Sequence, residues 1–178
     1  LGAAVMGHQL PPRLTGADWI WDLARLAADR GYGLFWLGSQ EGVTEAAAEQ
    51  LRRAVPDLRV VGTHHGYFDK VGAPSDEVVE AINRARPDIV LVGFGTPLQE
   101  RWIAANREAI DAPVVWALGA TADFISGDVS RGPSLLYDHG LEWLARLLVD
   151  PRRLWQRYLV GNTQFAVKVV RERARRKR

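Results

Sequence analysis

Short apolar runs alternate with amphipathic segments along most of the chain, and this alternation limits the possible folds more than any other feature. The runs are typical of strands buried on both faces, and the segments between them have the apolar spacing of helices. Strands and helices that alternate about every 25 residues are typical of βαβ units. We therefore predict an α/β fold, with a mostly parallel, Rossmann-like sheet and helices on both faces. The predicted strands are residues 34–37, 58–61, 89–92 and 114–118, of which the last two are expected to be buried. The predicted helices are residues 17–30, 44–54, 75–84 (where Ser75 can act as the cap) and 98–106.

The pattern changes after Gly140, where two helices are expected without a strand between them, over residues 141–148 and from 151 to about 173. We predict that residues 1–139 form the α/β domain and residues 140–178 a C-terminal helical appendage.

Charge is distributed unevenly over the chain. Residues 142–178 contain eleven Lys and Arg against three Asp and Glu, whereas the net charge of all 178 residues is only +2. A basic end on an acidic body indicates an anionic partner such as lipid headgroups, diphosphates or nucleic acid, although a solvated basic terminus is also compatible. The absence of cysteine excludes disulfides, thiolate catalysis and cysteine-bound zinc.

Glycine and polar residues follow the predicted strands, where parallel sheets bind ligands. Glycines let backbone N–H groups approach a ligand, and helix N-termini favour negative charge, so these turns suit a nucleotide diphosphate. They match neither a dinucleotide fingerprint nor a P-loop, and Gly93 and Gly95 are also compatible with an ordinary βα turn. The four turns are residues 38–42, 62–68, 93–100 and 119–123.

Two side chains in these turns are candidate ligand contacts. Gln99 lies in the first turn of a predicted helix with no evident structural role, and Asp123 can accept hydrogen bonds from a ribose or uracil or act as a helix cap. The adjacent His64 and His65 lack a third metal ligand at useful spacing, so no metal site is predicted.

Basic and aromatic residues mix in the C-terminal segment. Arg146, Arg153 and Arg157 are expected to converge on a diphosphate, with nearby aromatic residues at a membrane interface. A pair of amphipathic helices with a solvated basic face is the alternative.

Several motifs occur in one order over essentially the whole chain, which resembles the WecG/TagA/CpsF glycosyltransferase family. Long motifs of this kind are far more specific than a single glycine pattern. The motifs are RLTGAD (13–18), VGTHHGYF (61–68), PDIVLVGFGTPLQERW (87–102), GATADFISG (119–127), RGP (131–133) and GLEW (140–143).

The resemblance implies an inverting, metal-independent hexosyltransferase without a cofactor. It would move N-acetylmannosamine or a related sugar from a UDP-sugar to an undecaprenyl-diphosphate-linked sugar. The enzyme would be peripheral at the cytoplasmic face of the bacterial inner membrane, with self-association possible and no nucleic acid bound. Residues implied in UDP binding are Tyr67, Gly93, Gly95, Gln99 and Asp123; Arg13 and Gln99 would lie beside the transferred sugar and its diphosphate, and Arg146, Arg153 and Arg157 beside the phosphates or acceptor.

The chain also departs from the family pattern. Relatives have an Asp-Gly pair upstream of the position of Leu1, whose Asp resembles the general base, so we expect this chain to bind its ligands but to turn over slowly. Gln156 stands where many relatives have an arginine.

Two other kinds of function are compatible with the composition. A nucleic-acid-binding module would use the basic C-terminal segment, but the acidic body argues against it. A nonenzymatic adaptor at a lipid surface would bind vesicles and no nucleotide.

Overall fold

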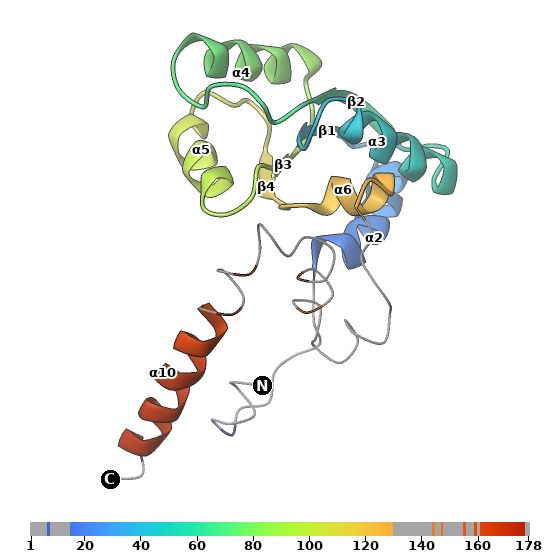
Figure 1. The fold of residues 1–178 in the computed structure, drawn as a ribbon. Coiled ribbons are helices and arrows are strands. Elements are labelled where there is room, and N and C mark those ends of the chain that lie inside the picture. Colours follow the sequence, from blue (N-terminus) through green and yellow to red (C-terminus); the bar gives the residue numbers. More distant parts are fainter. Residues whose placement is uncertain are drawn as a thin grey trace. The chain divides into compact units, whose positions relative to one another are not determined.

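The computed structural model describes residues 15–129 and 161–176, together with residues 7, 144, 147, 155 and 159 (Figure 1). The chain divides into two compact units. One unit is residues 14–129, and the other combines residues 1–13 with residues 130–178. We describe each unit by itself.

A parallel sheet of four strands, in the order β2-β1-β3-β4, forms the centre of residues 14–129. The two middle strands, β1 and β3, are buried along their whole length. They are in register to their carboxyl ends, where Gly38 lies opposite Gly93. The strands are β1 Gly33–Gly38, β2 Arg59–His64, β3 Ile89–Gly93 and β4 Val114–Ala117, so the predicted α/β fold with a parallel sheet is confirmed.

Helices cover both faces of this sheet (Figure 1). Successive side chains of a strand point to opposite faces, so Leu34 and Trp36 of β1 pack on one face and Phe35 and Leu37 on the other. The first face is covered by α2 Gly16–Arg30, α3 Val43–Ala54 and α6 Thr121–Ser126, and the second by α4 Ala73–Ala85 and α5 Leu98–Asn106.

The start of α4 differs from the sequence-based prediction. The helix begins at Ala73 after Gly72, so Ser75 is not its cap. Ser75 is instead buried, and its Oγ accepts a hydrogen bond of 2.8 Å from the indole Nε1 of Trp102. A buried indole N–H needs such a partner, which explains the hydroxyl inside α4.

The last strand is less buried than predicted. Val114 and Trp116 of β4 are 41% and 43% exposed, because β4 is the edge of the described sheet and has one neighbour, β3. Trp19 of α2 stacks on Trp116 with ring centroids 4.1 Å apart. The prediction of a buried strand at residues 114–118 is therefore wrong in its burial, although its position is right.

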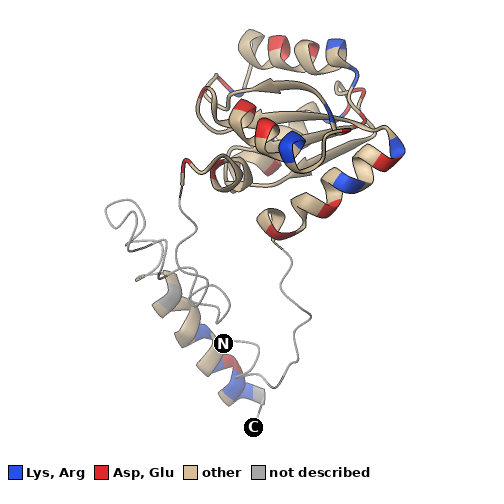
Figure 2. Cartoon of the chain, turned by 90° about the vertical axis from the view of Figure 1, so that its right-hand side faces the viewer, with Lys and Arg blue, Asp and Glu red and all other residues tan. Residues whose placement is uncertain are grey.

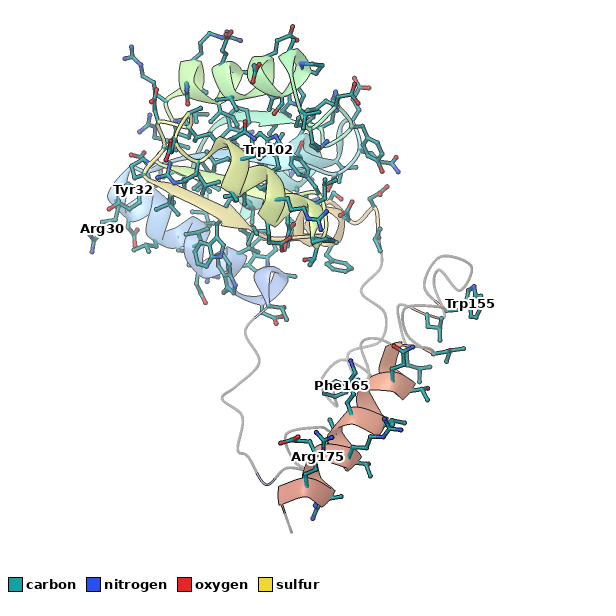
Figure 3. The ribbon with its side chains drawn as sticks, turned by 90° about the vertical axis from the view of Figure 1, so that its left-hand side faces the viewer. Arg30, Tyr32, Trp102, Trp155, Phe165 and Arg175 are labelled. Atoms are coloured by element: carbon teal, nitrogen blue, oxygen red, sulfur yellow. The ribbon has the colours of Figure 1, made fainter. Side chains whose placement is uncertain are left out.

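The second unit contains α10 Gly161–Arg176, which confirms a helical C-terminal segment. Phe165 and Val170 of α10 are exposed, and Phe165 and Arg175 are labelled in Figure 3. Basic residues outnumber acidic ones on α10, whereas both signs are interspersed over the helices of the α/β unit (Figure 2). Within the described part of the chain, no helix has the length and apolarity needed to cross a membrane.

Candidate ligand site at the carboxyl edge of the sheet

The carboxyl ends of β1 and β3 form a topological switch point. After β1 the chain turns to α3 on one face of the sheet, and after β3 it turns to α5 on the other face. The two adjacent turns therefore diverge, and in open α/β sheets ligands bind in the crevice outside such a point. Sequence reasoning placed the ligand at the strand ends; the strand order now selects the turns after β1 and β3 as its centre.

Glycines allow the backbones at this edge to approach one another closely. A Cβ on Gly38 would lie 2.5 Å from the carbonyl oxygen of Gly93, and a Cβ on Gly93 would lie 2.5 Å from the carbonyl oxygen of Gly119. No side chain fits at either position. Gly93, a predicted ligand contact, therefore has a packing role as well. Gly95, the other glycine predicted to contact the ligand, is half-buried and has a φ of +83°.

Gln99 has a structural role that its sequence position did not reveal. The side chain is only 5% exposed, and its Oε1 accepts a 3.0 Å hydrogen bond from the backbone N–H of Gly119. Its Nε2 donates to Glu100, whose carboxylate also accepts from Thr96. Gln99 thus joins the turn after β3 to the turn after β4, and the expectation that it has no structural task is wrong.

Glu100 lies in the first turn of α5, where a negative charge is favourable. The hydrogen bond from Gln99, followed by a backbone hydrogen bond and one from Thr96, lowers the pKa of the Glu100 carboxyl. The carboxylate is therefore the form that completes this turn.

Asp123 and Tyr67 present polar atoms near the same edge. Asp123 lies in the first turn of α6, is half-buried, and makes no side-chain hydrogen bond to another described residue. Tyr67 follows β2 and is 72% exposed. Both side chains come from turns at the carboxyl ends of strands, and both are available to a ligand.

An aromatic cluster with a partly buried cation supports the turn after β2. Phe68, Phe94 and Trp102 meet edge to face, with ring centroids 5.5–6.3 Å apart. The Nζ of Lys70 lies 3.7 Å from the ring centroid of Phe68 and 4.5 Å from that of Phe94. It also donates hydrogen bonds to the carbonyl oxygens of Gly66 and Phe68. Burial lowers the pKa of the Lys70 ammonium, against the opposing charge of Asp69.

Sequence reasoning did not find this cluster. Phe94 lies between Gly93 and Gly95, so its place in the turn after β3 could be predicted. Nothing in the sequence pairs it with Lys70, 24 residues earlier. Trp102 is labelled in Figure 3, where it lies within the α/β unit.

Hydrogen bonds to the backbone fix the tautomers of two histidines after β2. His64 Nδ1 lies 2.8 Å from the carbonyl oxygen of His65, which only accepts, so Nδ1 carries a proton. His65 Nδ1 accepts from the backbone N–H of Tyr67, so neutral His65 carries its proton on Nε2. Among the described residues, no group of three or more His, Cys, Asp or Glu is arranged to hold a metal ion.

Four predicted site residues lie outside the described residues. They stay predictions. They are Arg13, Arg146, Arg153 and Arg157.

The strand order and the two layers of helices define a doubly wound α/β protein with a topological switch point between β1 and β3. A family model described as "Glycosyl transferase WecG/TagA/CpsF family" matches residues 1–178. The chain therefore belongs to the WecG/TagA/CpsF family of glycosyltransferases.

Three relatives share the name N-acetylglucosaminyldiphosphoundecaprenol N-acetyl-beta-D-mannosaminyltransferase. The Bacillus subtilis (strain 168) protein is 30% identical over 170 residues, which cover 96% of this chain and 64% of the relative. The Bacillus spizizenii protein is 32% identical over 155 residues, covering 87% and 58%. The Staphylococcus aureus (strain NCTC 8325) protein is 29% identical over 145 residues, covering 82% and 56%. The chain thus spans less than two thirds of the length of these relatives.

Proposed function

We propose that the chain binds a UDP-sugar at the carboxyl edge of its sheet and transfers the sugar to a polyprenyl-diphosphate-linked acceptor. The observation that carries the proposal is the switch point between the diverging turns after β1 and β3, where glycine backbones meet. Such an edge suits a diphosphate, since backbone groups can approach it closely. The names of the relatives support N-acetylmannosamine as the sugar and N-acetylglucosamine on undecaprenyl diphosphate as the acceptor.

The proposed reaction is a single displacement with inversion at the anomeric carbon. An acceptor hydroxyl oxygen forms a bond to the anomeric carbon while the bond from that carbon to the β-phosphate oxygen breaks. UDP leaves with the electron pair, and the hydroxyl proton passes to a general base. In this proposal Asp123 accepts hydrogen bonds from the uridine, and Tyr67 lies over the bound UDP-sugar. Gln99 holds the turn after β3 against the turn after β4.

We further propose that cationic side chains, rather than a metal ion or an organic cofactor, offset the charge of the leaving diphosphate. Arg13, Arg146, Arg153 and Arg157 are the candidates. Activity that persists in the presence of EDTA is the expected result, and loss of activity restored by a divalent cation would contradict this part of the proposal.

The acceptor implies work at a lipid surface, and α10 is suited to that location. Its exposed Phe165 and Val170 share the helix with Lys168, Arg171 and Arg175. Exposed apolar side chains together with cationic ones favour an anionic membrane interface. We propose peripheral attachment at the cytoplasmic face of the inner membrane.

Calorimetry with UDP tests the donor site. We expect UDP to bind and Asp123→Ala to weaken binding by about ten-fold, as for one lost hydrogen bond to a charged group. Asp128→Ala is the matched control, because Asp128 is an exposed carboxylate just after the same helix.

UDP release that depends on a polyprenyl-diphosphate-linked N-acetylglucosamine in vesicles tests the transfer. Absence of UDP binding by the unaltered chain would refute the proposal.

A further inference from the structure

Ser39, the residue directly after β1, combines two features that are unfavourable in a protein without ligand. Its backbone φ is +55°, which lies in the left-handed region. Residues other than glycine, asparagine and aspartate rarely adopt this region. Its Oγ is buried without a hydrogen-bond partner, and native structures satisfy most such groups. Strained residues of this kind concentrate at ligand sites.

The main chain of Ser39 is held by both neighbouring turns. Its N–H donates to the carbonyl oxygen of Gly93 over 3.2 Å, and its carbonyl oxygen accepts from the N–H of Gly66 over 2.8 Å. The turns after β2 and β3 therefore fix the backbone at this position. The hydroxyl is the polar group of Ser39 that has no hydrogen-bond partner.

The other buried polar atom without a partner, among the described residues, is the indole Nε1 of Trp36. Trp36 lies in the core between the sheet and the helices α2 and α3, so its N–H is enclosed by apolar side chains. Ser39 differs because it stands at the switch point, where the two turns diverge. Only Ser39 of the two is positioned for a ligand in the crevice.

We propose that the Ser39 hydroxyl hydrogen-bonds the diphosphate of the bound nucleotide sugar, a contact that rests on the function proposed above. Ser39 as a whole is half-buried, and we expect a rotation about its Cα–Cβ bond to bring Oγ to the bound diphosphate. Glycine would adopt the same φ without strain, so the serine side chain has no structural advantage here. The ligand supplies the partner that the free protein lacks.

The experiment compares thermal stability and nucleotide affinity in three variants of the full chain. Ser39→Gly relieves the strain and removes the unpaired hydroxyl, so we expect its Tm to rise by about 3–6 °C. Its affinity for UDP is expected to fall by about ten-fold or more, with a similar fall in Ser39→Ala. Affinity for uridine, which has no phosphate, is expected to stay unchanged in both variants.

Arg86→Gly is the matched control. Arg86 is also a residue other than glycine at positive φ, +48°, but it is exposed and precedes β3, at the opposite edge of the sheet. Its replacement is expected to raise Tm by about 2–4 °C through the same backbone effect and to leave UDP affinity unchanged.

The outcomes separate this inference from the function on which it rests. If the unaltered chain binds UDP and both Ser39 variants bind it equally well, the inference is wrong and the function stands. Equal loss of UDP and uridine affinity, or a lower Tm in Ser39→Gly, would show a general disturbance of the turn and would also overturn it. If the unaltered chain does not bind UDP, the proposed function fails, and the inference fails with it.

Discussion

The two faces of the sheet differ in their side chains and in how far their packing extends. On the face covered by α2, α3 and α6, alanines such as Ala24, Ala27 and Ala47 let the helices lie close to the strands. On the face covered by α4 and α5, the core contains Trp102, and the partly buried Phe68 and Phe94 pack against it. These two phenylalanines belong to the turns after β2 and β3, so the aromatic packing continues into the candidate site.

On the face covered by α4 and α5, the same side chains are expected to contribute to stability and to ligand binding. On the other face, the core side chains are expected to contribute to stability alone. The aromatic contacts that hold α5 to the sheet also involve the turns after β2 and β3, which belong to the candidate site. A substitution there is expected to change both the free energy of unfolding and the affinity for a nucleotide. A substitution among the small and aliphatic side chains of the opposite face is expected to change the free energy of unfolding alone.

The largest expected effect compares Trp102→Ala with Leu51→Ala. Both side chains are fully buried, Trp102 against α4 and Leu51 against the opposite face. Trp102→Ala is expected to cost about 3–5 kcal/mol and Leu51→Ala about 2–5 kcal/mol, measured by denaturant unfolding. At a temperature where both variants are folded, we expect calorimetry to show UDP affinity lowered about ten-fold by Trp102→Ala and unchanged by Leu51→Ala. Equal losses of affinity in the two variants would contradict the distinction between the faces.

A smaller effect is expected from Lys70→Met, which keeps the length of the side chain and removes its charge. The variant loses two hydrogen bonds to carbonyl oxygens and the contact of the ammonium with two aromatic rings. Because Lys70 is only partly buried, we expect a cost of about 1–2 kcal/mol. The affinity for UDP is expected to fall a few-fold, since the turn that contains Tyr67 is no longer held. Retained affinity would show that the aromatic packing alone positions this turn.

The pH dependence of this variant has a definite sign. Burial lowers the pKa of Lys70 in the folded chain below the value of about 10.4 that the unfolded chain has. Between these two values the unfolded chain binds more protons, so the stability of the unaltered protein rises with pH relative to Lys70→Met. Thermal melts of both proteins between about pH 7 and 11 measure the change in their Tm difference. A Tm difference that moves the other way would contradict the burial of the ammonium.

The sequence predicted the sheet and the turns well, because strand burial and helix spacing leave a strong periodic signal. The sequence-based predictions fail where tertiary contacts determine the exposure or the hydrogen bonds of a side chain. The exposure of Trp116 depends on the strand order, and the bond of Gln99 to Gly119 depends on two turns that lie 20 residues apart. The strained φ of Ser39 is imposed by the turns after β2 and β3, so no local pattern indicates it.

The smallest expected effect comes from Thr63→Val and tests the opposite face at its boundary with the site. The Thr63 hydroxyl donates a 2.7 Å hydrogen bond to Glu45 of α3. Burial raises the pKa of Glu45, but the hydrogen bond from Thr63, a backbone hydrogen bond, a hydrogen bond from Thr44 and the charge of His64 together lower it. The stabilisation is therefore present above the unfolded pKa of about 4.3 and is lost as the pH falls through the lower, folded value.

Because Glu45 is exposed, we expect Thr63→Val to cost less than about 1 kcal/mol at neutral pH. The Tm difference from the unaltered protein should disappear in acid, and UDP affinity at neutral pH should not change. A Tm difference that persists in acid would assign the effect to packing rather than to the carboxylate, and a loss of UDP affinity would show that the contact between Thr63 and α3 also supports the site.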